Sequence, residues 1–332
     1  MIRNIIYIPY YFLKTPLDVF WDNISVISKI KNQSKWSIFI DIIRCSIINS
    51  TSLMDYFLLR FYDKNKTERS AYAGTGFMYE YQLKMNPKSK RDILEDKIKF
   101  FNHFAPFIGR KWFQLSDFEK NKEEIGKLLE VSEKIVLKDS KGQAGKEVEV
   151  IGKLPLNELY TYMNNKGFDL IEEFVVQHKD IQELAPRGLN TIRIITQLTE
   201  NNNVDIIGTI LRLSIDSNTD NLSVGNAAAS IDKANGVIDR KAVYGDFKKS
   251  DIDIHPISNK NIVGFKIPFW KESIELVTEA AKISNGNKSI GWDVAITEAG
   301  PILIEGNHNW GRTLWQLPVN QGLKHVLEAY YK

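Results

Sequence analysis

The stretch that decides the fold is GWDVAITEAGPILIEGN, residues 291–307. Its two apolar runs flank a Glu-Ala-Gly segment at residues 298–300, and a three-residue hairpin loop favours glycine at its last position, where the backbone is left-handed. Because side chains alternate along a strand, such a loop fixes which residues of the two strands lie opposite each other. The predicted opposing pairs are Thr297 with Pro301, Ala295 with Leu303, and Asp293 with Glu305.

The pairing of Asp293 with Glu305 indicates a cation site. Carboxylates on opposing strand residues lie about 5 Å apart at Cβ and repel each other. A divalent metal would neutralise them, and Asn307, which points to the same side, completes a set of oxygen ligands that suits Mg²⁺. The alternatives are a shared proton, a neighbouring cation, and an ordinary hairpin with its acids in solvent; a register slip of one residue would remove the pair.

A glycine- and lysine-rich loop follows an earlier predicted strand at residues 135–138. The strand ends at Lys138, and residues 141–146 read KGQAGK. Glycine lets backbone N–H groups approach phosphate oxygens, and lysine adds positive charge. The loop does not match the Walker pattern, so an ordinary surface turn is the competing interpretation.

Two further pairs of charged residues lie on predicted strands. Glu172 and Glu173 interrupt an apolar run, where they either face a ligand or lie on a solvated edge strand. Arg193 and Arg212 belong to the next two strands, and arginines beside a carboxylate site suit phosphate or acyl phosphate. Ion pairing with strand acids is the alternative for both arginines.

Periodicity predicts a chain that is mainly helical at first and mixed afterwards. Within residues 1–95, apolar residues recur at three- and four-residue steps, as at Trp36, Ile40 and Ile43, while residues 72–86 show no clear period. Further predicted helices cover residues 96–107, 156–164 and 270–284. Further predicted strands cover residues 148–151, 168–176, 191–198, 204–214, 291–297 and 301–307.

Composition narrows the classes of function. A net charge of +3 without a clustered basic face does not indicate a protein that binds nucleic acid. The single cysteine, Cys45, cannot form an intrachain disulfide and is predicted to be a small buried hydrophobe. The apolar run at residues 2–13 is too short to cross a bilayer and charges interrupt residues 36–61, so we predict no stable membrane span. Transient contact of residues 36–61 with a membrane surface is the alternative.

In this order, these motifs resemble the ATP-grasp superfamily and, within it, the sugar-transfer associated ATP-grasp group. The ribosomal-protein glutamate ligases and the D-alanine–D-alanine ligases are similar at greater distance. The resemblance covers residues 96–316, and the hairpin at residues 291–307 carries it most specifically. The other matching segments are residues 96–97, 136–138 with the glycine loop, 171–175, 190–193 and 220–221.

The resemblance implies an α+β fold, the ATP-grasp fold, in which two α+β sub-domains clasp ATP. Ahead of these sub-domains the chain departs from the family, because periodicity predicts a mainly helical N-terminal region where the family usually has a βαβ one. By position, residues 1–95 would form that region. Residues 96–170 would form the lid sub-domain with the glycine loop, and residues 171–332 the C-terminal sub-domain with the metal site.

The resemblance also implies a role for each candidate residue. ATP phosphates would be held by Lys97 and Lys138 and by the lid residues Gly142, Gly145 and Lys146. The adenine edge would be held by Glu173 and by the backbone of Phe174 and Val175. The ligands of Mg²⁺, with Mn²⁺ as the alternative metal, would be Asp293, Glu305 and Asn307. The residues near the γ-phosphate and the acceptor carboxylate would be Arg193, Arg212 and Asn221.

The implied reaction joins a carboxylate to an amine through an acyl phosphate, with release of ADP. The implied partners are small-molecule carboxylates and amines, and a nucleotide sugar or glycan precursor is one option. The name of the group suggests that an amino acid or other acid is attached to a surface-polysaccharide precursor. A phosphotransferase and a non-catalytic nucleotide-binding module are the competing interpretations. The expected location is cytoplasmic, with peripheral attachment to the inner face of the membrane as the alternative.

Overall fold

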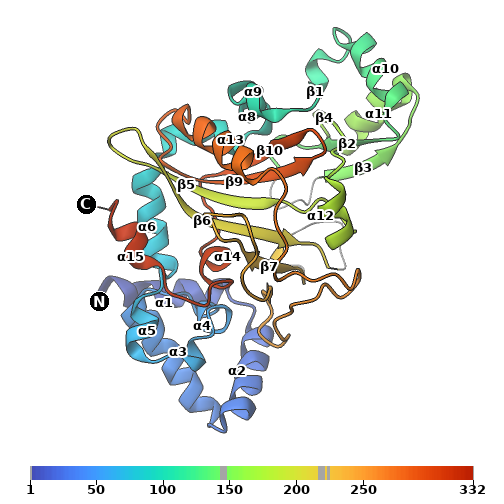
Figure 1. Cartoon of the computed structure of the whole chain (residues 1–332). Coiled ribbons are helices and arrows are strands. Elements are labelled where there is room, and N and C mark those ends of the chain that lie inside the picture. The colour runs from blue at the N-terminus through green and yellow to red at the C-terminus, as the bar shows by residue number, and fades with distance from the viewer. Residues whose placement is uncertain (1, 143–147, 216–220, 223–224, 332) are drawn as a thin grey trace.

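The structure is a computed structural model that describes residues 2–142, 148–215, 221–222 and 225–331. Figure 1 shows three parts: a lobe of helices at the bottom, a large antiparallel sheet in the middle, and a small sheet with two helices at the upper right. The fold class is α+β with a mainly helical N-terminal region, as the sequence predicts.

The large sheet has six antiparallel strands in the order β10-β9-β5-β6-β7-β8, and both of its faces are buried. Because side chains alternate along a strand, Ile194 and Leu211 join one core whereas Ile195 and Ile210 join the other. Its strands are β5 (Ile192–Leu198), β6 (Val204–Leu213), β7 (Ala227–Ser230), β8 (Val243–Tyr244), β9 (Ser289–Thr297) and β10 (Gly300–Asn307).

Helices cover both faces of the large sheet. On one face, α13 packs over β5 and β10 and shares a core with Phe100 and Phe104. On the other face, α6, α14 and α15 pack around Trp310 and Trp315, whose rings meet edge to face at 5.2 Å. These helices and their neighbours are α6 (Thr75–Met85), α7 (Asp92–Glu95), α8 (Lys97–His103), α9 (Ala105–Ile108), α13 (Trp270–Lys282), α14 (Arg312–Gln316) and α15 (Lys324–Glu328).

The small sheet has four antiparallel strands in the order β1-β4-β2-β3. Two helices, α10 and α11, pack against it through Ile125, Leu128 and Leu159, which meet Ile135 and Leu137 of β2. The elements of this part, with the helix α12 that follows it, are β1 (Trp112–Gln114), α10 (Lys122–Val131), β2 (Lys134–Lys138), β3 (Val148–Gly152), α11 (Leu156–Lys166), β4 (Leu170–Glu173) and α12 (Lys179–Leu184).

The β9–β10 hairpin confirms the predicted acid pair but not the predicted loop. The observed pairs next to the loop are Thr297 with Gly300 and Ala295 with Ile302, so the loop has two residues. The predicted pairs Thr297 with Pro301 and Ala295 with Leu303 are therefore wrong.

A β-bulge corrects the register of this hairpin before it reaches the acids. The bulge lies between Leu303 and Glu305, and the extra residue of β10 brings Glu305 opposite Asp293. Gly300 has a φ of +123°, which a residue with a side chain rarely adopts, so the glycine is needed at the turn as predicted.

The N-terminal helices pack around a core of their own. Inward-facing residues recur at helical spacing, as Phe20 and Ile24 do on α2 and Ile38 and Ile42 on α3. Cys45 belongs to this core as predicted, and burial raises the pKa of its thiol to about 11, which keeps it protonated. The helices are α1 (Ile2–Lys14), α2 (Leu17–Lys31), α3 (Lys35–Asn49), α4 (Asp55–Leu58) and α5 (Lys66–Ser70).

The predicted division of the chain at residues 95 and 170 stays a prediction. The core of the N-terminal lobe runs from Tyr11 to Tyr72, and the next helix, α6, packs on the large sheet. Within the part of the chain that the structure describes, no helix has the length and apolar character that a bilayer-spanning segment needs.

Three other segments differ from the predicted elements. Residues 72–86, which show no clear period, contain α6, because contacts of Tyr81 with the large sheet's core stabilise a helix that its sequence pattern does not indicate. The predicted helix at residues 96–107 is divided into α8 and α9 just before Pro106, which has no N–H to continue the helical hydrogen bonds. β4 ends at Glu173, three residues earlier than predicted.

Polar and aromatic contacts join the N-terminal lobe to the rest of the chain. Asp55 is fully buried, forms an ion pair with Arg312, and accepts a hydrogen bond from the Thr75 hydroxyl at 2.6 Å. Beside this pair, the Phe57 ring stacks on Phe247 with centroids 5.8 Å apart. The lobe is therefore fixed to the sheet through a buried charge.

We expect Arg312→Ala to lower the free energy of unfolding by about 3 kcal/mol, because it leaves the buried charge of Asp55 unpaired. Burial tends to raise the pKa of Asp55, but Arg312 and Thr75 outweigh burial and hold it below its ordinary value. The pair therefore contributes stability above the ordinary pKa of Asp and loses it as the pH falls below that value. Urea unfolding between pH 3 and pH 7 should show this acid sensitivity in the wild type and less of it in the variant.

The control is Arg240→Ala, which removes an exposed ion pair with Asp239 and should change stability by about 1 kcal/mol or less. Equal effects of the two substitutions would show that the buried pair does not hold the lobe in place.

Candidate functional site

One cleft of about 1210 Å³ lies where the N-terminal lobe, the small sheet and the large sheet meet. Residues of α2, α4, α8, β2, β5, β6, β9 and β10 line it. Nine predicted site residues from distant segments line this cleft: Lys97, Lys138, Gly142, Arg193, Arg212, Asn221, Asp293, Glu305 and Asn307. Two more, Gly145 and Lys146, lie outside the residues that the structure describes.

The acidic end of the cleft is built by β9 and β10. Asp293 is buried, and Glu305, directly opposite, is half-buried at the cleft surface. Asn307 lies on the same side as Glu305, as predicted, and its Nδ2 donates to Glu305 Oε1 at 3.0 Å. Burial and repulsion by Asp293 raise the pKa of Glu305. The three predicted oxygen donors therefore face one space. The ionised carboxylate of Glu305 is held there at a cost in stability.

Asp293 itself is held by two arginines. Arg193 donates from Nε and Nη2 to its two oxygens at 2.5 and 3.0 Å, and Arg212 Nη1 donates at 2.8 Å. Burial tends to raise the pKa of Asp293, but the two guanidinium charges outweigh burial and lower it well below its ordinary value. Gly291 gives Arg193 its path, since a Cβ there would lie 3.0 Å from Arg193 Cδ and 2.6 Å from Trp310 Cβ. The ion pairing that the sequence left as an alternative is thus present.

Lys97, the first residue of α8, reaches the start of the glycine loop. Its Nζ donates to the carbonyl oxygens of Asp139 at 3.0 Å and Gly142 at 2.5 Å. Burial lowers the pKa of Lys97, the nearby Glu305 opposes this shift, and the charge of Lys138 adds to it. Lys97 therefore lies between the loop, the second lysine and the acidic end of the cleft.

Lys138 is positioned by a buried carboxylate, Glu172 of β4. Glu172 lies opposite Val136 of β2 and Trp112 of β1, so the residues two positions away, Lys138 and Arg110, point to its side of the sheet. Lys138 Nζ lies 2.7 Å from Glu172 Oε1, and Arg110 Nε and Nη2 donate to Oε2 at 2.9 and 2.7 Å.

Both cations act on the ionisation of Glu172. Burial tends to raise the pKa of Glu172, but Lys138 and Arg110 outweigh burial and lower it. The interpretation of Glu172 as a solvated edge residue is wrong, because its side chain is 3% exposed. No sequence pattern pointed to Arg110, because it lies two residues before β1, a three-residue strand that was not predicted.

Three predicted residues, Glu173, Phe174 and Val175, do not line the cleft. The Glu173 carboxylate accepts a hydrogen bond from the Lys111 N–H at 2.9 Å. The Phe174 ring is exposed and lies 5.7 Å from the Lys134 ammonium. The adenine-binding role of the three residues stays a prediction.

The donors at the acidic end fit Mg²⁺ by their chemistry. Carboxylate and amide oxygens are its usual protein ligands, and a cation would relieve the repulsion between Asp293 and Glu305. Among the described residues, Glu305 takes part in no ion pair. Asp293 already has two guanidinium partners, so a metal would bind the oxygen lone pairs of Asp293 that the two arginines do not use. No group of three or more His, Cys, Asp or Glu side chains suited to a metal occurs in the described residues, so the third oxygen would be that of Asn307.

The N-terminal helices supply an apolar wall of the cleft. Val19 of α2 and Phe57 and Leu58 of α4 line it, together with Phe247 and Leu314 from the rest of the chain. Sequence reasoning gave these residues no role in the site, because helical periodicity separates buried faces from exposed ones without showing what a face meets.

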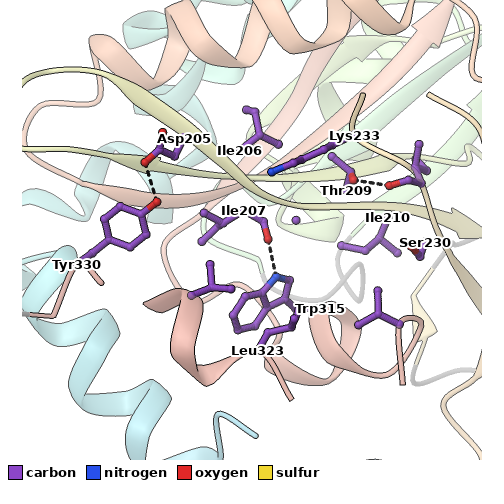
Figure 2. Close-up of a pocket in the computed structure, with 14 residues that line it drawn as sticks. Asp205, Ile206, Ile207, Thr209, Ile210, Ser230, Lys233, Trp315, Leu323 and Tyr330 are labelled. Atoms are coloured by element: carbon purple, nitrogen blue, oxygen red, sulfur yellow. Dashed lines mark hydrogen bonds between the residues drawn. The ribbon is translucent and has the colours of Figure 1, made fainter. Parts of the chain in front are cut away.

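A second, smaller hollow of about 500 Å³ lies between β6 and the C-terminal helices (Figure 2). Its polar groups bond each other: the Tyr330 hydroxyl donates to Asp205 at 2.6 Å, and Trp315 Nε1 donates to the Ile207 carbonyl at 2.8 Å. None of the predicted site residues lines it, so we assign the chemistry to the larger cleft.

Comparison with known proteins identifies the family of the chain. A family model described as "Sugar-transfer associated ATP-grasp" matches residues 155–332, more than half of the chain. No curated protein matches the sequence significantly.

Three solved structures illustrate what the fold is similar to. An N5-carboxyaminoimidazole ribonucleotide synthetase in complex with ADP is 10% identical with a TM-score of 0.41, and the alignment covers 68% of this chain and 46% of that chain. The ATP-grasp ligase PsnB with a precursor peptide and AMPPNP is 11% identical with a TM-score of 0.44, over 74% and 62%. The L-amino acid ligase from Bacillus licheniformis is 13% identical with a TM-score of 0.43, over 73% and 49%. This chain thus spans about half to two thirds of the length of these proteins.

Two isosteric substitutions at the acidic end should have opposite effects on stability. Glu305→Gln removes a carboxyl that burial and Asp293 both disfavour, so we expect the metal-free protein to gain about 1 kcal/mol. Asp293→Asn leaves Arg193 and Arg212 without their carboxylate, so we expect a loss of about 3 kcal/mol. Urea unfolding with EDTA at pH 7 measures both.

The pH dependence provides the control for this comparison. A raised pKa in the folded state costs stability only above the ordinary pKa of Glu, so the gain from Glu305→Gln should shrink as the pH falls toward that value. Loss of stability in both variants would contradict this description of the acid pair.

Proposed function

The chain belongs to the sugar-transfer associated ATP-grasp family, and we propose that it is an ATP-dependent ligase that joins a carboxylate to an amine. ATP and Mg²⁺ would be its cofactors. The observation that carries the proposal is the convergence of nine predicted site residues, from segments far apart in the sequence, on one cleft.

The proposed reaction has two steps. An oxygen of the substrate carboxylate attacks the γ-phosphorus of ATP, the bond to the β,γ-bridging oxygen breaks, and ADP leaves an acyl phosphate behind. The amine nitrogen then attacks the acyl carbon, phosphate departs, and the amine proton is lost. Such chemistry needs positioning and charge neutralisation more than a covalent contribution from the protein.

Basic residues on both sides of the cleft support this role. We propose that Lys97 and Lys138 bind phosphate oxygens: Lys97 is tethered to the carbonyls at the start of the glycine loop, and Lys138 to Glu172. Arg193 and Arg212, beside Asp293, would face the transferred phosphoryl group. Mg²⁺, held by Asp293, Glu305 and Asn307, would neutralise phosphate charge when bound.

The apolar wall of the cleft supports the exclusion of water. An acyl phosphate hydrolyses when water reaches it, so a ligase must shield the intermediate until the amine arrives. Val19, Phe57 and Leu58 line the cleft from the side of the N-terminal lobe, and their surfaces offer water no hydrogen-bond partner.

One observation favours a second candidate, a nucleotide-binding module without catalysis. Asp293 is paired with two arginines, which compete with a metal for its oxygens. If the pair with Arg193 and Arg212 persisted with nucleotide in the cleft, Glu305 and Asn307 alone would be left for the metal, and binding without turnover would result.

We further propose that the acceptor is a sugar or a surface-polysaccharide precursor that receives an amino acid or another acid in the cytoplasm. The support is the family description, which connects these ATP-grasp proteins with sugar transfer. Acceptor specificity would be set by the wall of the cleft that the N-terminal lobe contributes. This wall lies outside the residues that the family model matches.

We expect a non-hydrolysable ATP analogue to bind the wild type in a Mg²⁺-dependent manner. Lys138→Ala should weaken binding about 10- to 100-fold, the value of a lost charge-assisted hydrogen bond. Asn307→Ala should reduce the effect of Mg²⁺ while leaving the ion pairs of Asp293 intact. Isothermal titration calorimetry with and without Mg²⁺ measures these effects, with Lys134→Ala, at the exposed end of the same strand, as the control. A folded wild type that binds no analogue would overturn the ATP-grasp enzyme proposal.

We expect ADP release to require a carboxylate substrate. In a panel of amino acids and sugar acids, the right acid should release ADP with hydroxylamine present and yield a hydroxamate, because hydroxylamine traps an acyl phosphate. ADP formation that persists without any carboxylate but needs a sugar hydroxyl would identify a phosphotransferase. Binding of the analogue with no ADP release under any condition would favour the non-catalytic module.

A further inference from the structure

The outward face of α3 carries a stripe of exposed residues. Trp36, Ile40, Arg44 and Ile48 follow one another at steps of four, which places them along one side of the helix. Its three apolar members are 67%, 49% and 66% exposed. The opposite side, represented by Ile42, fills the core of the lobe, so packing within the lobe does not require the exposed stripe.

Apolar residues of α1 and α2 extend this stripe into a surface. The Trp21 ring lies against Trp36 with centroids 6.1 Å apart and stacks on Phe39 at 5.6 Å. Leu17, one turn before Trp21, is 52% exposed, and Leu13 at the end of α1 is 85% exposed. Single exposed apolar residues are common, but a contiguous group of them marks a contact site.

Basic side chains are interspersed with these apolar residues. The exposed basic residues on the three helices are Lys14, Lys29, Lys35 and Arg44, and none of them forms an ion pair with another residue that the structure describes. Three acids lie on these helices. Asp22 pairs with Lys248 and Asp41 with Arg69, whereas Asp18 is exposed and forms no ion pair with a residue that the structure describes. The four exposed cations outnumber the one unpaired acid, so the surface combines exposed apolar area with an excess of positive charge.

We propose that this surface binds a membrane that contains anionic lipids. It is formed by the apolar residues Leu13, Leu17, Trp21, Trp36, Ile40 and Ile48 with the four basic residues. Tryptophan prefers the boundary between headgroups and acyl chains, and long basic side chains place their apolar stems there while their charges reach lipid phosphates. The helices would lie in the plane of the interface.

A second copy of the chain fits this surface poorly. In a two-fold dimer the same patch meets itself, so the four cations of one copy would face those of the other with only the unpaired Asp18 of each copy to offset them. A lipid surface supplies both complements at once, because phosphates match the cations and acyl chains match the apolar residues. The proposal does not depend on the proposed ligase activity, since none of the residues that form the surface lines the cleft.

The test is co-sedimentation of the full chain with large vesicles. We expect the wild type to bind vesicles of equal parts phosphatidylcholine and phosphatidylglycerol, and to bind pure phosphatidylcholine far more weakly. Lys29→Gln with Lys35→Gln should lower binding about fivefold for each lysine, and only on the anionic vesicles. Trp36→Ser with Ile40→Ser should lower binding on the order of tenfold and reduce the blue shift of tryptophan fluorescence caused by the vesicles, with Trp21 as the remaining tryptophan of the surface.

The matched control is Val131→Ser with Ile257→Ser, two exposed apolar residues elsewhere, which should bind like the wild type. An unchanged urea unfolding midpoint for every variant shows that the fold is intact. A wild type that does not bind anionic vesicles overturns the proposal, and so does binding that the Trp36 and Ile40 substitutions leave unchanged. Light scattering that shows a dimer, lost in the same variant without any vesicle binding, would identify a second copy as the occupant instead.

Discussion

The carboxylate of Asp293 is the buried charge around which the large sheet is arranged. A buried carboxylate without partners costs several kcal/mol, and the structure meets that cost with guanidinium groups from two different strands. Arg193 belongs to β5 and Arg212 to β6, while Asp293 belongs to β9. A slip of one residue in any of these strands would turn a partner to the opposite face, so the ion pairs hold the register of three strands. The register of these three strands therefore fixes the geometry of the acidic end of the cleft.

The small sheet uses the same arrangement on its own side of the cleft. Glu172 on its second strand from the edge is buried between Lys138 of β2 and Arg110, which lies two residues before β1. This arrangement fixes the lysine that we propose for phosphate binding and leaves its ammonium at the cleft surface. Two buried carboxylates, Asp293 and Glu172, each neutralised by two cations, therefore position the two walls between which a nucleotide would lie. Glu305, in contrast, forms no ion pair among the described residues and its pKa is raised, so this is the place where a metal would contribute most.

The N-terminal lobe takes part in both the site and the surface of the protein. Its own core contains Phe20, Ile24 and Ile38, and Asp55 fixes it to Arg312 at the start of α14. Because α2 and α4 line the cleft, the lobe contributes to the place where a substrate would bind. Its outer face has a different chemistry, with tryptophan and lysine side by side and few acids free to pair.

Much of the fold could be predicted from the sequence, because local patterns record which face of an element is buried. Richness in β-branched residues at 191–198 and 204–214 identifies strands, and a glycine at position 300 identifies a turn. Segments with a weak period were predicted less well. The helix α6 was missed because contacts with the large sheet stabilise it, and the strand β1 was missed because three residues are too few to show a pattern.

The sequence by itself determined the residue types of the site and their order, and so the family. The tertiary structure decided what each residue contacts. The acid pair of Asp293 and Glu305 was predicted from a loop of the wrong length, and it exists because a bulge in β10 restores the register. The choice between Glu172 and Glu173 as the buried acid, and the partnership with Arg110, depended on which strands are neighbours. Strand neighbours are set by long-range packing, and no local pattern of side chains encodes them.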